Sequence, residues 1–470
     1  MESCVAAKQF RLLSILVSLV RISDDEFVAE IRLHFPMAAG ILNYPVVKKY
    51  TNPLDEAALV DDPSPARVGG AAMAVLEREL SPTTAGRAER YVGRDLMDIY
   101  TKVIAQERLT YDDAVRLYKT PDLSAVGYMA NIVRERLHGD RAYYVRNQHI
   151  NYTNVCNKGC KFCSFYAKKG GPAPYEMDMA AVRNRLREHL DVPITEVHMV
   201  GGIDPRLPYQ YYLDLLRTVK ETRPGVHIKA FTAVELVQIQ EVAGKPLEEV
   251  LRELMAAGLD SLPGGGIEIL SDRVHRELFE RKLDGDEWMN VSRVAAKVGL
   301  TQYATMLYGH IETLEERADH LVKIRDLQDE TGHFVTMTPL SFHPENTELE
   351  HIAHPTGYDD LRNLAVARLV LDNFAHIKSF WIMNTPQITQ LALWYGADDM
   401  DGTVHEYEIT YKDGDLGNKK QQLTRTQMIK LIEEAGRIPI ERDSLYHEVA
   451  QHPEEADRRS SSLIMLPVLH

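Results

Sequence analysis

Three cysteines lie close together in the segment CNKGCKFC, where Cys156, Cys160 and Cys163 have the spacing C-x3-C-x2-C. A disulfide framework would spread an even set of cysteines along the chain, so this clustering indicates a metal site in a reducing compartment. The fourth cysteine, Cys4, is about 150 residues away. The triplet therefore predicts a site with three protein thiolates.

Three thiolates on one tight loop can bind three irons of a 4Fe-4S cluster and leave the fourth iron without a protein ligand. Clusters that only transfer electrons normally have four cysteine ligands, and structural zinc sites also close with four ligands. S-adenosylmethionine (SAM) can chelate the open iron, so that one electron cleaves its S–C5′ bond and yields a 5′-deoxyadenosyl radical. A zinc site with His149 as the fourth ligand is the alternative.

The cysteine motif resembles the signature of the radical SAM superfamily, C-x3-C-x-aromatic-C, with Phe162 in the aromatic position. The resemblance implies that the backbone around Phe162 approaches the adenine of SAM. It also implies that a glycine-rich segment after the second strand receives the methionyl amino group of SAM. Gly201 and Gly202 occupy that place, although a tight turn between a strand and a helix also explains a glycine pair.

Further segments resemble the aminofutalosine synthase family over about residues 85–446; they include IKAFTAVE, GLDSLPGGGIEIL, MLYGHIET, FHPENT, GADDMDGTV and AGRIPIERDSLY. The resemblance implies that the radical adds to the vinyl carbon of 3-[(1-carboxyvinyl)oxy]benzoate. The products would be 6-amino-6-deoxyfutalosine, methionine and CO2 or bicarbonate, in menaquinone biosynthesis. A flavodoxin- or ferredoxin-type protein is the electron donor implied. Dehypoxanthine futalosine cyclase and a subunit of the deazaflavin (F420 precursor) synthase are related alternatives.

Polar residues at the ends of expected strands are candidates for the reaction site, because the carboxyl ends of barrel strands form the active face. Glu235 ends the third strand and could accept hydrogen bonds from SAM, or it could be a carboxylate at a helix N-terminus. His310 and Glu312 follow the fifth strand, and His343 and Asn346 follow the sixth. We predict catalytic roles for His310, Glu312 and His343, and substrate binding by Asn346.

The two carboxylates of the implied substrate call for cationic or amide partners, for which Arg293 is a candidate. Gly264 and Gly265 could let the backbone come close to the substrate, with a simple bulge as the alternative.

Asp398, Asp399 and Asp401 resemble a metal-binding run. We interpret them as a solvated or helix-capping loop, because no second metal is needed.

Short apolar runs alternate with longer amphipathic ones from about residue 141, as in successive βα units. We expect seven strands, at 143–153, 196–202, 227–233, 261–269, 301–310, 334–342 and 377–383, with an eighth at 402–410. The fold class predicted is α/β, a radical SAM TIM-type (β/α) barrel over residues 141–446, with C-terminal helices. A helical preamble precedes it at 85–140.

Residues 1–84 combine Pro, Gly and acidic residues and are expected to be a variable, partly disordered extension; residues 447–470 form a tail. The apolar run at 10–22 is shorter than the roughly 20 residues needed to cross a bilayer. We expect a helix packed on the barrel there, rather than a signal peptide or a mis-assigned start.

The net charge of -15 argues against nucleic-acid binding. A cytoplasmic enzyme is predicted, with a metal-stabilised binding protein as the alternative of another class.

Overall fold

The computed structural model describes residues 91–168, 173–403 and 422–449, together with three strands near the N-terminus. These strands, β1 (Ser14–Ser23), β2 (Glu26–His34) and β3 (Val46–Thr51), form an antiparallel sheet within a compact unit of its own, Met1–Pro82. The helix expected at 10–22 is therefore wrong, because residues 14–21 of this run pair with β2. The rest of the predicted extension, and the tail from residue 450, lie outside the described residues.

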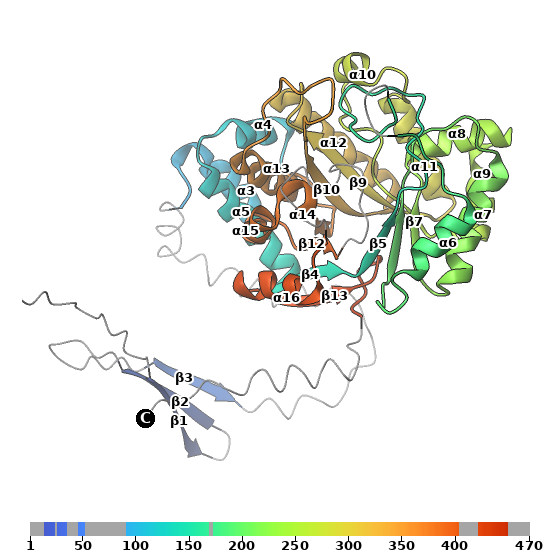
Figure 1. Ribbon diagram of the computed structural model, residues 1–470. Helices are drawn as coiled ribbons and strands as arrows, with labels where there is room; N and C mark the ends of the chain where they lie inside the picture. Colours follow the sequence, from blue (N-terminus) through green and yellow to red (C-terminus); the bar gives the residue numbers. More distant parts are fainter. Residues whose placement is uncertain are drawn as a thin grey trace, which may run out of the picture. The chain divides into compact units, whose positions relative to one another are not determined.

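Parallel strands form the central sheet, in the order β11-β10-β9-β8-β7-β6-β5 (Figure 1). The strands are β5 (Asn147–Ile150), β6 (Glu196–Met199), β7 (His227–Ala230), β8 (Ser261–Leu262), β9 (Thr301–Tyr308), β10 (Phe334–Ser341) and β11 (His376–Ile377). Six of the seven expected segments contain one of these strands, and the seventh, 377–383, shares only Ile377 with β11. The sheet follows chain order because a helical connection returns each strand to the same edge. The curled α/β half-barrel confirms the predicted fold class.

A second sheet has the order β12-β4-β13 and is also parallel. Its strands are β4 (Arg141–Val145), β12 (Asp399–Gly402) and β13 (Ile438–Arg442). β4 leads directly into β5, and a parallel bridge from Lys378 to Asp399 joins β12 to the end of β11. Only the first residue of the expected eighth strand belongs to β12, and residues 404–421 lie outside the described residues.

Helices cover the outer face of the central sheet (Figure 1). They are α6 (Met179–Arg187), α7 (Tyr209–Thr222), α8 (Ala233–Ala243), α9 (Leu247–Ala257), α11 (Gly285–Lys297), α12 (Leu314–Thr331) and α13 (Gly357–Val370). Outward-facing strand residues such as Val197, Met199, Ala304 and Met306 are fully buried against them. The remaining helices are α10 (Asp272–Leu278), which packs against Cys160, α14 (Trp381–Asn384) and α15 (Pro386–Ala392), which pack together, and α16 (Arg425–Glu434), which packs on β13. Within the described residues, no helix combines the length and apolar character that a membrane span requires.

The helices before the barrel are η2 (Arg94–Leu96), α3 (Met97–Ala105), α4 (Tyr111–Lys119) and α5 (Leu123–His138). Thr110 caps α4, since its side chain accepts from the Asp113 amide and Asp113 accepts from the Thr110 amide. α5 packs against α13, with Met129 and Ala130 fully buried. The preamble therefore covers the barrel through its apolar face.

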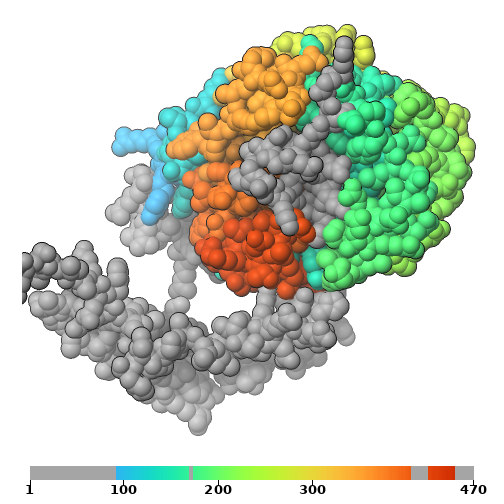
Figure 2. All heavy atoms as spheres, viewed as in Figure 1, coloured from blue at the N-terminus to red at the C-terminus, as the bar shows by residue number. Residues whose placement is uncertain are grey.

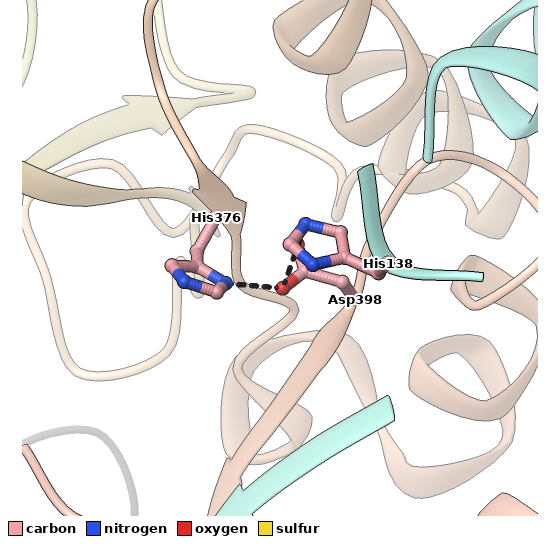
Figure 3. Close-up of side chains that lie close together, drawn as sticks. All are labelled: His138, His376 and Asp398. Atoms are coloured by element: carbon pink, nitrogen blue, oxygen red, sulfur yellow. Dashed lines mark hydrogen bonds and ion pairs between the residues drawn. The ribbon is translucent and has the colours of Figure 1, made fainter. Parts of the chain in front are cut away.

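The acidic run at β12 is buried and ion-paired, so the expectation of a solvated or helix-capping loop is wrong. Asp398 pairs with Arg368 and accepts a hydrogen bond of 2.6 Å from His376 Nδ1, while His138 Nε2 lies 3.5 Å away (Figure 3). His138 donates instead to the carbonyl oxygen of Ala375 at 2.8 Å. These groups link α5, β11 and α13 to β12.

The other two aspartates of the run face the barrel interior. Asp399 pairs with Arg442 of β13, and Asp401 lies 3.1 Å from Lys378 Nζ. Neither side chain of the Asp399–Arg442 pair is exposed. Buried charges persist in proteins when they are paired, and here each anion has a cation from another element.

Replacing Asp398→Asn should destabilise the fold by about 3–5 kcal/mol, because it leaves the buried Arg368 guanidinium without its counter-charge. Urea unfolding would measure the loss. Asp214→Asn is the matched control, because its ion pair with Arg217 is exposed and should contribute less than about 1 kcal/mol. Equal effects of the two substitutions would contradict this account.

Acid should destabilise the protein below about pH 6.5, the usual pKa of an unfolded histidine. Burial lowers the pKa of His149 to about 4 and that of His320 to about 3, so both are neutral in the folded state. Their contribution to the free energy of unfolding is present above pH 6.5. It is lost as the pH falls, at up to about 1.4 kcal/mol per pH unit for each histidine. Unfolding free energies measured from pH 7 to pH 4.5 test this slope.

The variant His320→Gln should reduce that slope, whereas His447→Gln should leave it unchanged, because the His447 side chain is 74% exposed. An unchanged slope in His320→Gln would show that the acid sensitivity arises elsewhere.

Candidate functional site

The cysteine triplet lies on the loop that follows β5, at the carboxyl ends of the strands. The loop is fixed by backbone hydrogen bonds from three directions: Asn157 N to Ile203 O (3.0 Å), Lys161 N to Leu278 O (2.9 Å) and Glu348 N to Lys161 O (2.9 Å). All three cysteines are free; Cys160 is buried, whereas Cys156 and Cys163 are half-buried. The sulfurs are thus held on one short loop beside α10 and the loop after β10.

Burial raises the pKa of Cys160 to about 12 and also raises that of Cys163, although the positive charge of Lys282 opposes the shift. Lys282 is buried, pairs with Glu268, and lies 5.2 Å from the centroid of the Phe162 ring. Thiols of this kind lose their protons when a metal binds. Three adjacent thiols with a buried cation beside them fit the donor set of a 4Fe-4S cluster with one open iron.

Phe162 holds the loop in place. Its ring meets Phe279 edge to face, with centroids 5.8 Å apart, and packs in a small cluster with Cys160, Ile269 and Leu307. The approach of its backbone to the adenine of SAM stays a prediction.

The glycine pair after β6 packs directly against the start of the cysteine loop. A Cβ on Gly202 would overlap the carbonyl oxygen of Val155, and one on Gly201 would lie 2.6 Å from the Tyr152 ring. The Gly202 amide donates to Thr153 O at 2.7 Å. Only glycine allows this approach, so the pair positions the cysteine loop whatever its role toward SAM.

The carboxylate of Glu235 is hydrogen-bonded within the protein. Two roles were considered for it, and the structure shows the one at a helix N-terminus. It caps α8 through the Thr232 amide (2.7 Å), and it accepts from Tyr152 Oη (2.7 Å) and the Gly201 amide (3.0 Å). Burial raises its pKa, against the effect of these hydrogen bonds. Glu235 therefore supports the glycine pair.

His310 and Glu312 form a tight turn after β9 and do not present free groups to the mouth of the barrel. Glu312 accepts from the Gly309 amide (2.6 Å) and pairs with Arg317 (2.7 Å). His310 Nε2 donates to Leu307 O at 3.0 Å. Burial opposes ionisation of Glu312, but His310 and Arg317 lower its pKa to about 2. Both side chains are fully buried and stabilise this turn, and their catalytic role stays a prediction.

His343 and Asn346 lie on the loop between β10 and α13, which contacts the cysteine loop. The Asn346 carbonyl accepts from Lys168 Nζ at 3.0 Å, and His343 Nε2 donates to Met383 O at 3.0 Å. Burial lowers the pKa of His343, so its imidazole is neutral near pH 7. This loop, in orange, and the cysteine loop, in teal, lie at the same end of the barrel (Figures 1 and 2). The structure thus brings His343 and Asn346 to the cluster site.

Gly264 and Arg293 are not placed as predicted. A Cβ on Gly264 would collide with the backbone of β9, so this glycine serves strand packing, while Gly265 lies beside Thr232. Arg293 lies near the C-terminus of α11, ion-paired with Glu330 at 2.8 Å and 43% exposed. Because α11 runs antiparallel to the strands, Arg293 is at the end of the barrel opposite the cysteines, and its position does not support the predicted substrate role.

His149 does not join the cysteines, contrary to the zinc alternative. It lies on β5 and is buried, with its ring 4.5 Å from that of His198 on β6. Sequence reasoning missed the inward-facing His198 on β6. The signal available was a polar residue at every second position of strands that are otherwise apolar.

Comparisons with known proteins agree with this geometry. Residues 150–324 match the model of the radical SAM superfamily, and residues 331–456 match that of the CofH/MqnC C-terminal region. An aminodeoxyfutalosine synthase of Thermus thermophilus is 44% identical over 358 residues, which cover 75% of this chain and 96% of the relative. A cyclic dehypoxanthine futalosine synthase of Halalkalibacterium halodurans is 36% identical over 368 residues, which cover 78% and 98%.

A solved structure, methylornithine synthase (PylB), aligns with a TM-score of 0.60 at 19% identity and covers 77% of this chain and 99% of its own. At this identity the likeness supports the fold alone.

The variant Cys160→Ser should lose the cluster, because two thiolates cannot hold the cubane in place of three. Anaerobic reconstitution followed by iron and sulfide analysis should give roughly four irons per wild-type chain and less than one in the variant. Cys4→Ser is the matched control and should keep its iron. Zinc in place of iron, or loss of iron in Cys4→Ser, would contradict this assignment.

Proposed function

The chain belongs to the radical SAM superfamily, in the branch that carries the CofH/MqnC C-terminal region, and on that premise we propose that it is an aminofutalosine synthase. Members of the superfamily use a 4Fe-4S cluster and SAM, and Cys156, Cys160 and Cys163 fit the CxxxCxxC motif. The chain is thus a radical SAM enzyme. The alternative of a metal-stabilised binding protein without catalysis is set aside.

The observation that carries the proposal is the greater identity to an aminodeoxyfutalosine synthase than to a cyclic dehypoxanthine futalosine synthase, over nearly the full length of both relatives. The proposed reaction joins the 5′-deoxyadenosyl radical from SAM to the vinyl carbon of 3-[(1-carboxyvinyl)oxy]benzoate. The adduct radical then rearranges through the aromatic ring: the aryl–O bond breaks, an aryl–C bond forms, and the ether oxygen becomes a ketone. The carboxyl group leaves as CO2 or bicarbonate together with one electron, which offsets the electron used to cleave SAM. The other products are 6-amino-6-deoxyfutalosine and methionine.

The cluster, when bound by the three cysteines, supplies the electron that cleaves SAM. The remaining task of the chain is positioning, because a primary radical attacks any nearby C–H bond. Phe162 and Phe279 fix the cysteine loop, and Gly201 and Gly202 let the loop after β6 approach it. We propose that the loop after β10, with His343, covers the reacting groups, with Asn346 toward the substrate.

The partners proposed are this aromatic enolpyruvyl acid and a flavodoxin- or ferredoxin-type electron donor. Free cysteines that bind a cluster require a reducing compartment, which supports a cytoplasmic location. Menaquinone biosynthesis is the pathway proposed.

Reconstituted, reduced enzyme incubated with SAM and 3-[(1-carboxyvinyl)oxy]benzoate should form 6-amino-6-deoxyfutalosine, detected by mass spectrometry. Cys160→Ser should form none, because it lacks the cluster that starts the reaction. Formation of 5′-deoxyadenosine alone would count against the synthase. Consumption of dehypoxanthine futalosine in a parallel incubation would assign the chain to the cyclase instead.

A further inference from the structure

The inner face of the barrel keeps accessible surface, although the outer face is sealed by helices. Val197 and Met199 on β6 point outward and are fully buried, whereas His198 between them is partly exposed. On β9, Thr305 is partly exposed, whereas Tyr303 and Leu307 on the same side of the strand are buried. A TIM barrel with a filled interior would bury both faces. The inner face therefore keeps local accessible surface at His198 and Thr305.

His198 presents a polar atom that the fold does not satisfy. Its Nε2 is buried from solvent and has no hydrogen-bond partner among the described residues. Burial, with the nearby charge of Lys229, holds the pKa of His198 well below its usual value, so the imidazole is neutral. Buried polar groups in native proteins are almost always paired, and an exception calls for an explanation.

Lys229 on β7 adds an ammonium group beside His198. Its Nζ lies 2.7 Å from Glu196 Oε1 and 4.5 Å from the centroid of the Tyr303 ring. Glu196 also accepts from Ser444 Oγ at 2.8 Å through its other oxygen, so its position is fixed. An ammonium group has three N–H donors and Glu196 takes one, which leaves donors for a further acceptor.

The position of His198 matches the shape of the proposed substrate. His198 lies three residues before Gly201, roughly 10 Å below the glycine pair along the strand. The vinyl group of 3-[(1-carboxyvinyl)oxy]benzoate has to lie near SAM at the mouth. Its ring carboxylate is at the other end of the molecule and therefore points into the barrel.

We propose that His198 and Lys229 bind the ring carboxylate of the aromatic substrate at the inner face of the barrel. This inference rests on the proposed function and assigns residues to it. A carboxylate supplies the acceptors that both side chains lack, and a hydrogen bond to a charged group is about twice as strong as a neutral one. The pair thus favours a substrate that has a carboxylate on its aromatic ring over one that lacks it.

Two ligands test the assignment: 3-[(1-carboxyvinyl)oxy]benzoate and 2-phenoxyacrylate, which lacks the ring carboxylate. Equilibrium dialysis with the cluster-loaded enzyme and SAM, without reductant, measures binding without turnover. For the benzoate, His198→Ala and Lys229→Met should each raise Kd about 10- to 100-fold. For 2-phenoxyacrylate, wild type and variants should have the same Kd.

The control Lys220→Met removes a lysine ion-paired with Asp260 outside the barrel and should leave both Kd values unchanged. His198→Gln keeps an N–H donor and should restore part of the affinity. If Lys229→Met fails to fold because Glu196 is left charged, the double variant with Glu196→Gln replaces it. SAM cleavage without substrate should proceed at the wild-type rate in the Lys220→Met control.

An equal loss of affinity for both ligands, or no loss for the benzoate, would overturn the assignment. If wild type converts the benzoate and the variants bind it normally, this inference fails and the proposed function stands. If wild type neither binds nor converts the benzoate, both fail.

Discussion

One close approach of two backbones holds the reaction site together. The loop after β6 meets the start of the cysteine loop at Gly202 and Val155, where a side chain would not fit. Tyr152 and Glu235 support the same contact from below, because Glu235 bonds the Gly201 amide, the Tyr152 hydroxyl and the cap of α8 at once. Residues that follow three barrel strands thus position the cysteine loop. A small shift of any of these strands would move the thiols, which have to reach a common metal.

Much of the fold, and the metal site, could be predicted from local patterns. The three cysteines are neighbours in sequence, and the alternation of strands and helices depends on side chains a few residues apart. The failures share a cause, because each depended on a partner far along the chain. Asp399 is predicted to be part of a solvated loop, because its partner Arg442 is 43 residues away in the sequence. Arg293 needed the direction of its helix, which motif spacing does not contain.

Among the residues that the structure describes, the barrel interior is polar and contains ion pairs. Lys229, Lys378 and Arg442 face Glu196, Asp401 and Asp399, one anion for each cation. Such an interior is costly to desolvate, and a purely structural core would use apolar side chains instead. An enzyme that handles a free radical also needs a space that water and stray C–H groups do not enter. Fixed ion pairs can provide orientation there without mobile, reactive groups.

Strand β4 has a consequence for how the molecule is made. It precedes the barrel in sequence, but its two neighbours in the sheet, β12 and β13, come about 250 and 300 residues later. Pairing over such separations is slow, because the intervening chain has to be ordered first. A ribosome therefore releases the cysteine loop long before the sheet under it can close. Through that interval the thiols lie on an unfinished barrel.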